Sequence, residues 1–170
     1  MVDERLRDYI QVLGEGAQGF GLDIDWGDYP FVTSSHCTAA GALLNGFPPG
    51  AIRHVWGVAK VYETYVGQKK FEPNQEIFKK IRAAGEEYGA TTGRPRRTGA
   101  IDIPLLARAV KLTGADEIII TFTDFFLDEE TVPVCFQYEL IDKSKVGKAP
   151  DNVDLIKKAI ITELPAWRCE

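Results

Sequence analysis

The stretch Glu117-Ile118-Ile119-Ile120-Thr121-Phe122 decides the fold class of this chain, because it is apolar almost without interruption. A short run rich in β-branched residues predicts a strand, and its lack of polar alternation predicts burial on both faces. Strands of that kind lie in sheets that helices cover on both sides. We therefore expect an α/β protein built around a central sheet.

The segments around this strand alternate between helical and extended patterns. Residues 74–84 show the helical periodicity of apolar positions, and Asp102 is a good N-cap for a second helix over 103–112, which stops before Gly114. The remaining expected elements are a strand over 9–13, a short helix over 38–44, one or two strands over 55–66, a half-exposed strand over 132–140 and a helix over 152–160. This order predicts a layered central sheet with flanking helices, in a single domain spanning residues 1–170.

Composition and charge exclude several classes of function. The chain has 170 residues, enough for a proper core, and its net charge of −5 provides no overall basic field for nucleic acid. No apolar run is long enough to cross a membrane, and the first residues do not resemble a signal peptide. The three cysteines are scattered, which argues against a disulfide framework, and the two histidines lack metal-ligand spacing. We expect a cytoplasmic protein that binds neither nucleic acid nor membranes.

A basic, glycine-flanked segment is the most informative feature for function: Ala90-Thr91-Thr92-Gly93-Arg94-Pro95-Arg96-Arg97-Thr98-Gly99. Pro95 favours an extended backbone at Arg94, so the side chains of Arg94 and Arg96 should point the same way. Two guanidinium forks suit a ligand with two carboxylates, or with a phosphate and a carboxylate. A solvated basic surface loop is the alternative interpretation of the same residues.

The glycine-rich segment Gly14-Glu15-Gly16-Ala17-Gln18-Gly19 has the spacing of a dinucleotide-binding turn. Such a turn must open a helix, which residues 20–27 do not favour, and Asp23 and Asp25 come too early to bind the ribose. A dehydrogenase is therefore a distant alternative. We expect the glycines to let the backbone approach a ligand, with the Gln18 amide at the centre.

Several ordered sequence blocks resemble adenylosuccinate synthetase. The blocks are Glu15-Gly16-Ala17-Gln18-Gly19, Leu22-Asp23-Ile24-Asp25, Tyr29-Pro30-Phe31-Val32-Thr33-Ser34-Ser35, residues 57–67 and residues 87–99. The likeness fades after Asp124 and returns weakly over residues 163–167. It implies a ligase of purine biosynthesis that forms a C–N bond between L-aspartate and inosine monophosphate (IMP), with GTP cleavage driving the step toward AMP.

The resemblance implies roles for the nucleotide-binding residues. The family phosphorylates the purine 6-oxygen, and the aspartate amine then displaces the phosphate, so charge develops on oxygens in both steps. Gln18 would be the catalytic residue of this chain, binding IMP through its 6-phosphoryl intermediate. Thr33 and Ser34 would bind the 5′-phosphate, and Leu22 and Val66 the base and ribose. The alternative interpretation is structural: Gln18 would be a turn residue, Thr33 and Ser34 loop residues, and Leu22 and Val66 core residues, with no role in binding.

By the same resemblance, the basic segment would bind L-aspartate, through Thr91, Thr92, Gly93, Arg94 and Arg96. Arg94 would also contact IMP, and Arg96 would reach the triphosphate of GTP. Because glycines flank the loop and its charges lack obvious partners in the sequence, we expect it to be mobile without ligand.

Asp124 follows the expected buried strand and, by resemblance, would accept hydrogen bonds from the guanine ring of GTP. The family commonly has lysine where this chain has Phe122. The choice between GTP and ATP is therefore left open. A carboxylate that caps the next turn is the alternative interpretation of Asp124.

Parts of such a ligase have no counterpart in this sequence. The family's glycine-lysine phosphate loop, its catalytic aspartate and its catalytic histidine are missing, since His36 and His54 fall outside the family's motif positions. The sequence matches the central and C-terminal part of a synthetase, without the N-terminal part. We expect Mg²⁺ ligands in that other part and none in this chain, weak or no activity of the chain alone, a homodimer, and possible pairing with a separate N-terminal half.

Two further interpretations remain open. The pair His36-Cys37, together with Tyr65, resembles a phage branch that adds aspartate to deoxyguanylate (dGMP) with ATP or GTP, a 2-aminoadenylosuccinate synthetase. The other is a noncatalytic nucleotide-binding remnant that kept the fold and lost the chemistry.

Overall fold

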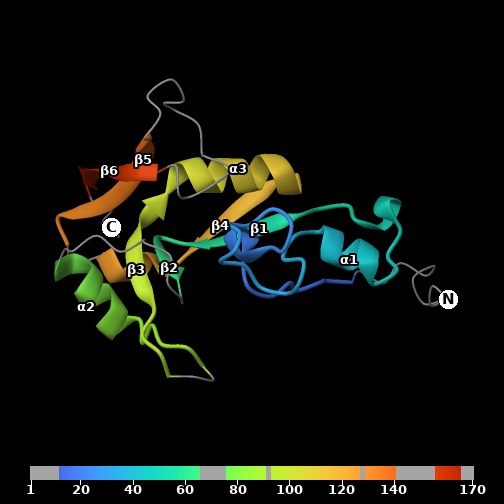
Figure 1. The fold of residues 1–170 in the computed structure, drawn as a ribbon, viewed down its shortest axis with the longest axis horizontal. Coiled ribbons are helices and arrows are strands. Elements are labelled where there is room, and N and C mark those ends of the chain that lie inside the picture. The colour runs from blue at the N-terminus through green and yellow to red at the C-terminus, as the bar shows by residue number, and fades with distance from the viewer. Residues whose placement is uncertain (1–11, 66–75, 91–92, 127–128, 141–155, 166–170) are drawn as a thin grey trace.

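The computed structural model describes residues 12–65, 76–90, 93–126, 129–140 and 156–165, which form helices, short 3₁₀ helices (η) and strands (Figure 1). In chain order these are η2 (Phe20–Leu22), α1 (Ala40–Leu44), η3 (Pro49–Ala51), β1 (Trp56–Lys60), β2 (Tyr62–Tyr65), α2 (Glu76–Ala84), β3 (Arg97–Asp102), α3 (Ile103–Thr113), β4 (Glu117–Thr121), η4 (Thr123–Phe126), β5 (Thr131–Leu140) and β6 (Ile156–Pro165).

The strands form two sheets. β1 pairs in parallel with β4, and a four-stranded sheet has the order β2-β3-β5-β6, in which only the β3–β5 pair is parallel. Val61 carries the chain directly from β1 in the first sheet to β2 in the second. Figure 1 shows α1 at one end of the molecule, β5 and β6 at the other, and β1 and β4 between them. The predicted mixed α/β architecture is confirmed, with the strands divided between two sheets.

The core lies where α2 packs against the four-stranded sheet. Phe78 and Ile81, on the apolar face predicted for this helix, are buried beside Tyr62 and Phe126. The buried Thr98 hydroxyl on β3 donates to the carbonyl of Phe78 at 2.7 Å, which fastens the helix to the sheet. This anchoring fixes the segment that connects α2 to β3, where the basic loop lies.

Helix α3 begins and ends where the sequence predicts. The Asp102 carboxylate accepts from the backbone N–H of Leu105 at 2.9 Å, which satisfies one free donor of the first turn. Its other oxygen accepts from the buried hydroxyl of Tyr138 on β5. Gly114 ends the helix at φ 67°, a left-handed conformation that favours glycine. The predicted helix over 103–112 is confirmed to within one residue.

The strand over Glu117–Thr121 is confirmed, but its expected burial on both faces is wrong. Ile119 is 47% exposed and Ile120 is 38% exposed. The reason is that, within the described residues, β4 pairs with β1 alone, and helices do not cover both faces of this two-stranded sheet. The apolar run therefore indicates the strand correctly and its environment incorrectly.

Three other predictions need correction. The expected helix over 152–160 is wrong, because residues 156–165 form β6, which is antiparallel to β5. The expected alternation of β5 fails over residues 132–135, which are all buried: α3 packs against this strand, and β3 and β6 flank it within the sheet. The basic segment was expected to be a loop as far as Gly99, but its last residues begin the buried strand β3.

Other expectations are confirmed or fall outside the described residues. The short helix α1 forms within 38–44, and the extended run over 55–66 divides into β1 and β2. Most of the expected strand over 9–13 lies outside the described residues. No helix in the described part of the chain is long and apolar enough to cross a membrane.

Candidate functional site

A solvent-open hollow of ≈600 Å³ lies at the end of the two-stranded sheet. The residues that line it are Gln18, Val58, Ala59, Lys60, Thr121 and Phe122. Because β1 and β4 are parallel, their carboxyl ends meet at the same edge, and Lys60 and Thr121 are register partners there. Open α/β sheets bind ligands outside the carboxyl ends of their strands, so this hollow is the candidate site.

Backbone conformation also marks this region. Three non-glycine residues in the described ranges have positive φ: Gln18 at 63°, Phe122 at 59° and Glu86 at 48°. Two of them line the hollow, and the third precedes Glu87, whose carboxylate binds Lys60. Such conformations cost about 1–3 kcal/mol each and concentrate at functional sites. Gln18 lies at a bend between Gly16 and Gly19 and lines the hollow.

Lys60 connects the hollow with the protein interior. Its ammonium lies 5.1 Å from the centre of the Phe122 ring and 5.4 Å from that of Tyr62, and it forms an ion pair with Glu87. Aromatic faces attract a cation that is partly removed from water. The ammonium is therefore held in one place at the wall of the hollow.

Glu87 is a buried carboxylate with donors on both oxygens. Oε1 accepts from Lys60 and, at 2.7 Å, from the Tyr62 hydroxyl, while Oε2 lies 3.1 Å from Nη1 of Arg96. Burial raises the pKa of Glu87, but the hydrogen bonds from Lys60 and Tyr62 and the nearby positive charges outweigh burial and lower it. Burial and the Glu87 carboxylate raise the pKa of Tyr62. Glu87 is thus an anion that accepts a hydrogen bond from the Tyr62 hydroxyl.

The described residues on the two sides of the basic loop run antiparallel, with Tyr88 paired to Pro95, and form a narrow hairpin at the lower edge of Figure 1. The N–H of Arg96 donates to the carbonyl of Glu87, and the N–H of Gly89 donates to the carbonyl of Arg94, both at 2.8 Å. The Arg96 side chain is half-buried and paired with Glu87, whereas that of Arg94 is exposed. The expectation that the charges of this loop lack partners is wrong, because the Arg96 guanidinium pairs with Glu87 at the base of the hairpin.

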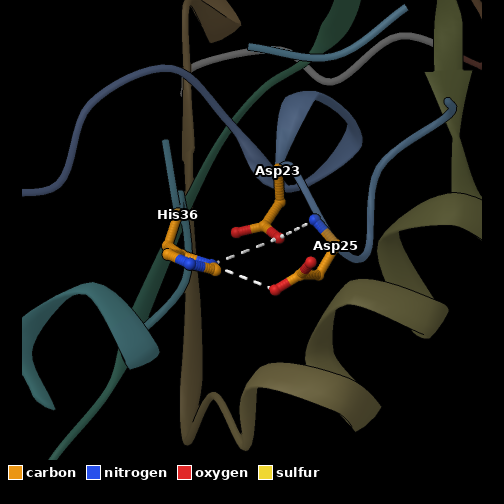
Figure 2. A group of neighbouring side chains, drawn as sticks. All are labelled: Asp23, Asp25 and His36. Carbon is orange, nitrogen blue, oxygen red and sulfur yellow. Dashed lines mark hydrogen bonds and ion pairs between the residues drawn. The ribbon is translucent and has the colours of Figure 1, made fainter. Parts of the chain in front are cut away.

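The irregular segment that carries Thr33 is organised by the buried Asp23 (Figure 2). One carboxylate oxygen accepts from the N–H groups of Asp25 and Trp26 at 3.0 and 3.1 Å, and the other accepts from that of Cys37 at 2.6 Å. A Cβ at Gly27 would lie 2.5 Å from the carbonyl oxygen of Asp23, so the turn requires glycine. These contacts fix a segment that has no helix or strand.

Asp23, Asp25 and His36 form a cluster of potential metal ligands in the described residues. His36 Nδ1 lies 3.5 Å from Oδ2 of Asp25 and 4.0 Å from Oδ1 of Asp23. Mg²⁺ requires an octahedral set of oxygen ligands, whereas both Asp23 oxygens already accept backbone N–H groups and the third member is an imidazole. The cluster does not fit Mg²⁺, and its contacts stabilise the loop.

The structure places the predicted residues unevenly around the hollow. Gln18 lines the hollow. The carbonyl of Leu22 accepts a hydrogen bond from the N–H of Thr33 at 2.8 Å, so Leu22 and Thr33 lie side by side. Thr33 is half-buried, while Ser34, Gly93 and Asp124 are exposed. Asp124 lies in the first turn of η4, just beyond Phe122. Val66, Thr91 and Thr92 lie outside the described residues.

Sequence reasoning missed Lys60, Glu87 and Tyr62, which connect the hollow to the arginine hairpin. Both Lys60 and Glu87 lie within the blocks that carry the family resemblance, but neither matches a motif with a known chemical role. One signal was available: Lys60 is the single charged residue between Val55 and Tyr62 in a run of apolar and aromatic residues. A lone cation in a strand requires a partner.

Comparisons with known proteins agree with this geometry. The model of the adenylosuccinate synthetase family matches residues 1–170. The adenylosuccinate synthetase of Halothermothrix orenii is 41% identical over 98% of this chain, and that of Petrotoga mobilis is 44% identical over 92%. The chain spans 40% and 38% of the lengths of these two relatives.

Solved structures give the same result. A fully ligated adenylosuccinate synthetase from Plasmodium falciparum superposes with a TM-score of 0.82 and 33% identity, over 91% of this chain and 38% of that one. The succinoaminodeoxyadenylate synthetase of cyanophage S-2L, bound to dGMP and dATP, has a TM-score of 0.54 and 23% identity over 65% of this chain and 35% of that one, which shows a shared fold. Sequence blocks, fold and the family match over the whole length agree, and this chain belongs to the adenylosuccinate synthetase family.

Proposed function

We propose that this chain forms the purine- and aspartate-binding part of an adenylosuccinate synthetase. The overall reaction joins the amine of L-aspartate to C6 of IMP, with transfer of the γ-phosphoryl group of GTP to the 6-oxygen and its release as phosphate. The observation that best supports this proposal is the link between Gln18 and Arg96: Gln18 and Lys60 line one hollow, and Glu87 binds both Lys60 and Arg96.

In this proposal Gln18 is the catalytic residue of the chain. Negative charge develops on the 6-oxygen during phosphorylation and on the departing phosphate afterward, so a fixed amide donor at that position stabilises both steps. Thr33 and Ser34 bind the 5′-phosphate, and Leu22 and Val66 contact the base and ribose. The hydrogen bond between Leu22 and Thr33 supports this assignment, because it holds the two segments together next to the Gln18 turn.

L-aspartate binds at the hairpin in this proposal, through Thr91, Thr92, Gly93, Arg94 and Arg96. Its two carboxylates match two guanidinium forks, each of which can form paired hydrogen bonds. The half-buried position of Arg96 supports the assignment, since partial removal from water strengthens its interaction with an anion.

The donor nucleotide is GTP in this proposal, with Asp124 accepting from the guanine ring and Arg96 near the triphosphate. Mg²⁺ would neutralise phosphate charge when bound, and its ligands are expected outside this chain. Phe122 lines the hollow two residues before Asp124, so the donor base would lie near an aromatic ring. ATP is the alternative donor. We also expect a homodimer and a cytoplasmic enzyme.

A chimera tests the proposal. This chain replaces the matching segment of the Petrotoga mobilis relative, and products are separated after incubation with L-aspartate and either IMP or dGMP, each with GTP or ATP. Adenylosuccinate formed from IMP, and lost in Gln18→Ala, supports the proposal. Turnover of dGMP alone would assign the chain to the phage-type reaction. A folded chimera that turns over neither purine would indicate a noncatalytic remnant.

A further inference from the structure

Glu87 is a buried ionisable group that the proposed reaction does not use. It is 2% exposed, and both carboxylate oxygens are engaged by side-chain donors. The donors come from three different segments: Lys60 ends β1, Tyr62 begins β2, and Arg96 lies at the return of the hairpin. One carboxylate therefore connects the wall of the hollow to an arginine of the basic loop.

Glu87 and Arg96 are also joined through the backbone. The N–H of Arg96 donates to the Glu87 carbonyl at 2.8 Å, and the Glu87 N–H donates to the carbonyl of Arg82 at 3.0 Å. The Arg82 side chain donates back to the Arg96 carbonyl at 2.7 Å. The backbone at Arg96 is thus fixed against the end of α2. The additional effect of the Glu87 carboxylate is to fix the direction of the Arg96 guanidinium.

Stability alone is a weak explanation for this cluster. A buried ion pair pays a desolvation penalty that often exceeds its attraction, and apolar replacements of the same volume are often neutral or stabilising. The cluster instead keeps two cations around one anion, so one positive charge remains beside the hollow. A net positive charge with fixed geometry is suited to binding an anion.

The Arg96 guanidinium has binding capacity left after pairing with Glu87. Nη1 is committed to Oε2 of Glu87, and the buried Nε has no hydrogen-bond partner among the described residues. A guanidinium presents five N–H donors in a rigid fork, so fixing one nitrogen also fixes the direction of the others. Because Nε is buried, a carboxylate of a ligand would bind the guanidinium through its Nη groups.

We propose that Glu87 is a positioning residue, which orients the Arg96 guanidinium toward the hollow so that it recognises one carboxylate of the amino acid substrate. This inference rests on the proposed function, because it takes Arg96 as a ligand-binding residue. Glu87 does not contact the substrate. It acts through Arg96, and Lys60 and Tyr62 hold it in place from the opposite side.

Simple electrostatics predicts the opposite result, which makes the proposal testable. Removing the negative charge of Glu87 raises the positive potential around Arg96 and should strengthen binding of any anion. Loss of orientation should instead weaken binding and reduce the preference for L-aspartate over D-aspartate, because stereochemical discrimination depends on a fixed guanidinium. Loss of the Glu87 charge and loss of the Arg96 orientation therefore change the affinity for L-aspartate in opposite directions.

The experiment measures dissociation constants for L- and D-aspartate by calorimetry with the full chain and IMP. Glu87→Gln removes the charge and keeps an acceptor, and Glu86→Gln removes the same charge from the exposed neighbour. Tyr62→Phe removes one donor to Glu87 without changing any charge, and Tyr138→Phe is its control, since that hydroxyl binds Asp102 instead. Thermal unfolding of each variant establishes that it is folded.

We expect Glu87→Gln to bind L-aspartate about tenfold or more weakly, with the L-to-D preference reduced, since small misplacement of a binding group has large effects. Tyr62→Phe should shift both quantities the same way by a smaller factor, and it carries the test if Glu87→Gln does not fold. Both controls should stay within about twofold of the parent, because the Glu86 side chain is exposed and the Tyr138 hydroxyl binds Asp102 instead of Glu87.

Two results would overturn the proposal, and only the second would also overturn the proposed aspartate site. If the parent chain binds L-aspartate but Glu87→Gln and Tyr62→Phe bind it equally well or better with the same L-to-D preference, Glu87 does not position Arg96 and the proposed function stands. If the parent chain shows no saturable binding of L-aspartate, the aspartate site itself is wrong and this inference fails with it.

Discussion

The carboxylate of Asp23 accepts a hydrogen bond at 2.6 Å from the backbone N–H of Cys37, 14 residues further along the chain. The segment between them forms no helix or strand, so its backbone cannot satisfy its own donors in a regular ladder. One buried side chain closes this long loop and sets the positions of Thr33 and Ser34 next to the Gln18 turn. The loop and the proposed phosphate site therefore depend on the same carboxylate.

The Asp23→Asn substitution should destabilise the chain by about 1–3 kcal/mol, because an amide NH₂ would face the Cys37 N–H in place of an acceptor. Denaturant unfolding measures the loss. Asp25→Asn is the matched control, since the Asp25 side chain is exposed and should change stability by about 0.5 kcal/mol or less. Equal losses in the two variants would contradict the role given to Asp23.

Acid should destabilise the chain through Asp23 and Glu87. Burial raises the pKa of Asp23, but hydrogen bonds from three backbone N–H groups and the nearby His36 lower it below its ordinary value of 3.8. The pKa of Glu87 also lies below its ordinary 4.5. A lowered folded-state pKa gives stability that is present above the unfolded-state pKa and lost as pH falls through the folded value.

The free energy of unfolding should therefore decrease as pH falls below about 4.5, with a smaller decrease in Asp23→Asn than in the parent. Denaturant titrations at a series of pH values from about 6 to about 2 measure both slopes. Stability that rises on acidification would show that these carboxylates are not favoured as anions in the folded state.

The Thr98→Val substitution should cost about 1–2 kcal/mol, because it removes the buried hydroxyl that fastens Phe78 of α2 to β3. Thr113→Val removes a similar bond, from a hydroxyl to the Ala109 carbonyl at 2.8 Å, at the half-buried end of α3. Its cost should be clearly smaller, since water can replace the lost donor. Unfolding by urea compares the two, and a larger loss at Thr113 would contradict the assignment of the core.

Ile81→Ala and Ile119→Ala test the unequal burial of two apolar segments. Ile81 is buried in the α2 interface, so its truncation should cost about 2–5 kcal/mol. Ile119 lies on the exposed β4 strand, and its truncation should cost about 1 kcal/mol or less. Calorimetric unfolding of both variants measures the difference. A large loss at Ile119 would mean that this face of the sheet is covered in solution.

Local signals predicted elements whose determinants are close in sequence. The Asp102 cap and Gly114 define α3 within a dozen residues, and the apolar face of α2 is evident from its spacing. The strand β6 was mistaken for a helix because its pattern of apolar and charged residues fits both periods. Its conformation is decided by pairing with β5, a contact that the local pattern does not contain.

The site could be predicted in part for a similar reason. Gln18 and Arg96 belong to recognisable motifs, whereas Lys60 and Glu87 acquire meaning when folding brings residues 27 positions apart into one ion pair. The exposure of Ile119 also depends on which elements pair and pack, and composition cannot supply that. Residues that act through a neighbour carry the weakest signal in sequence.

The most direct test of the central claim observes Arg96 and Gln18 together. The Nε–H resonance of Arg96, assigned with Arg96→Lys, and the backbone N–H resonance of Gln18 are followed by NMR as L-aspartate is added to the chain with IMP present. We predict saturable shifts of both signals with one dissociation constant, while the same concentration of D-aspartate produces little change. Binding of L-aspartate that leaves either signal unmoved, or no binding at all, would contradict a shared site.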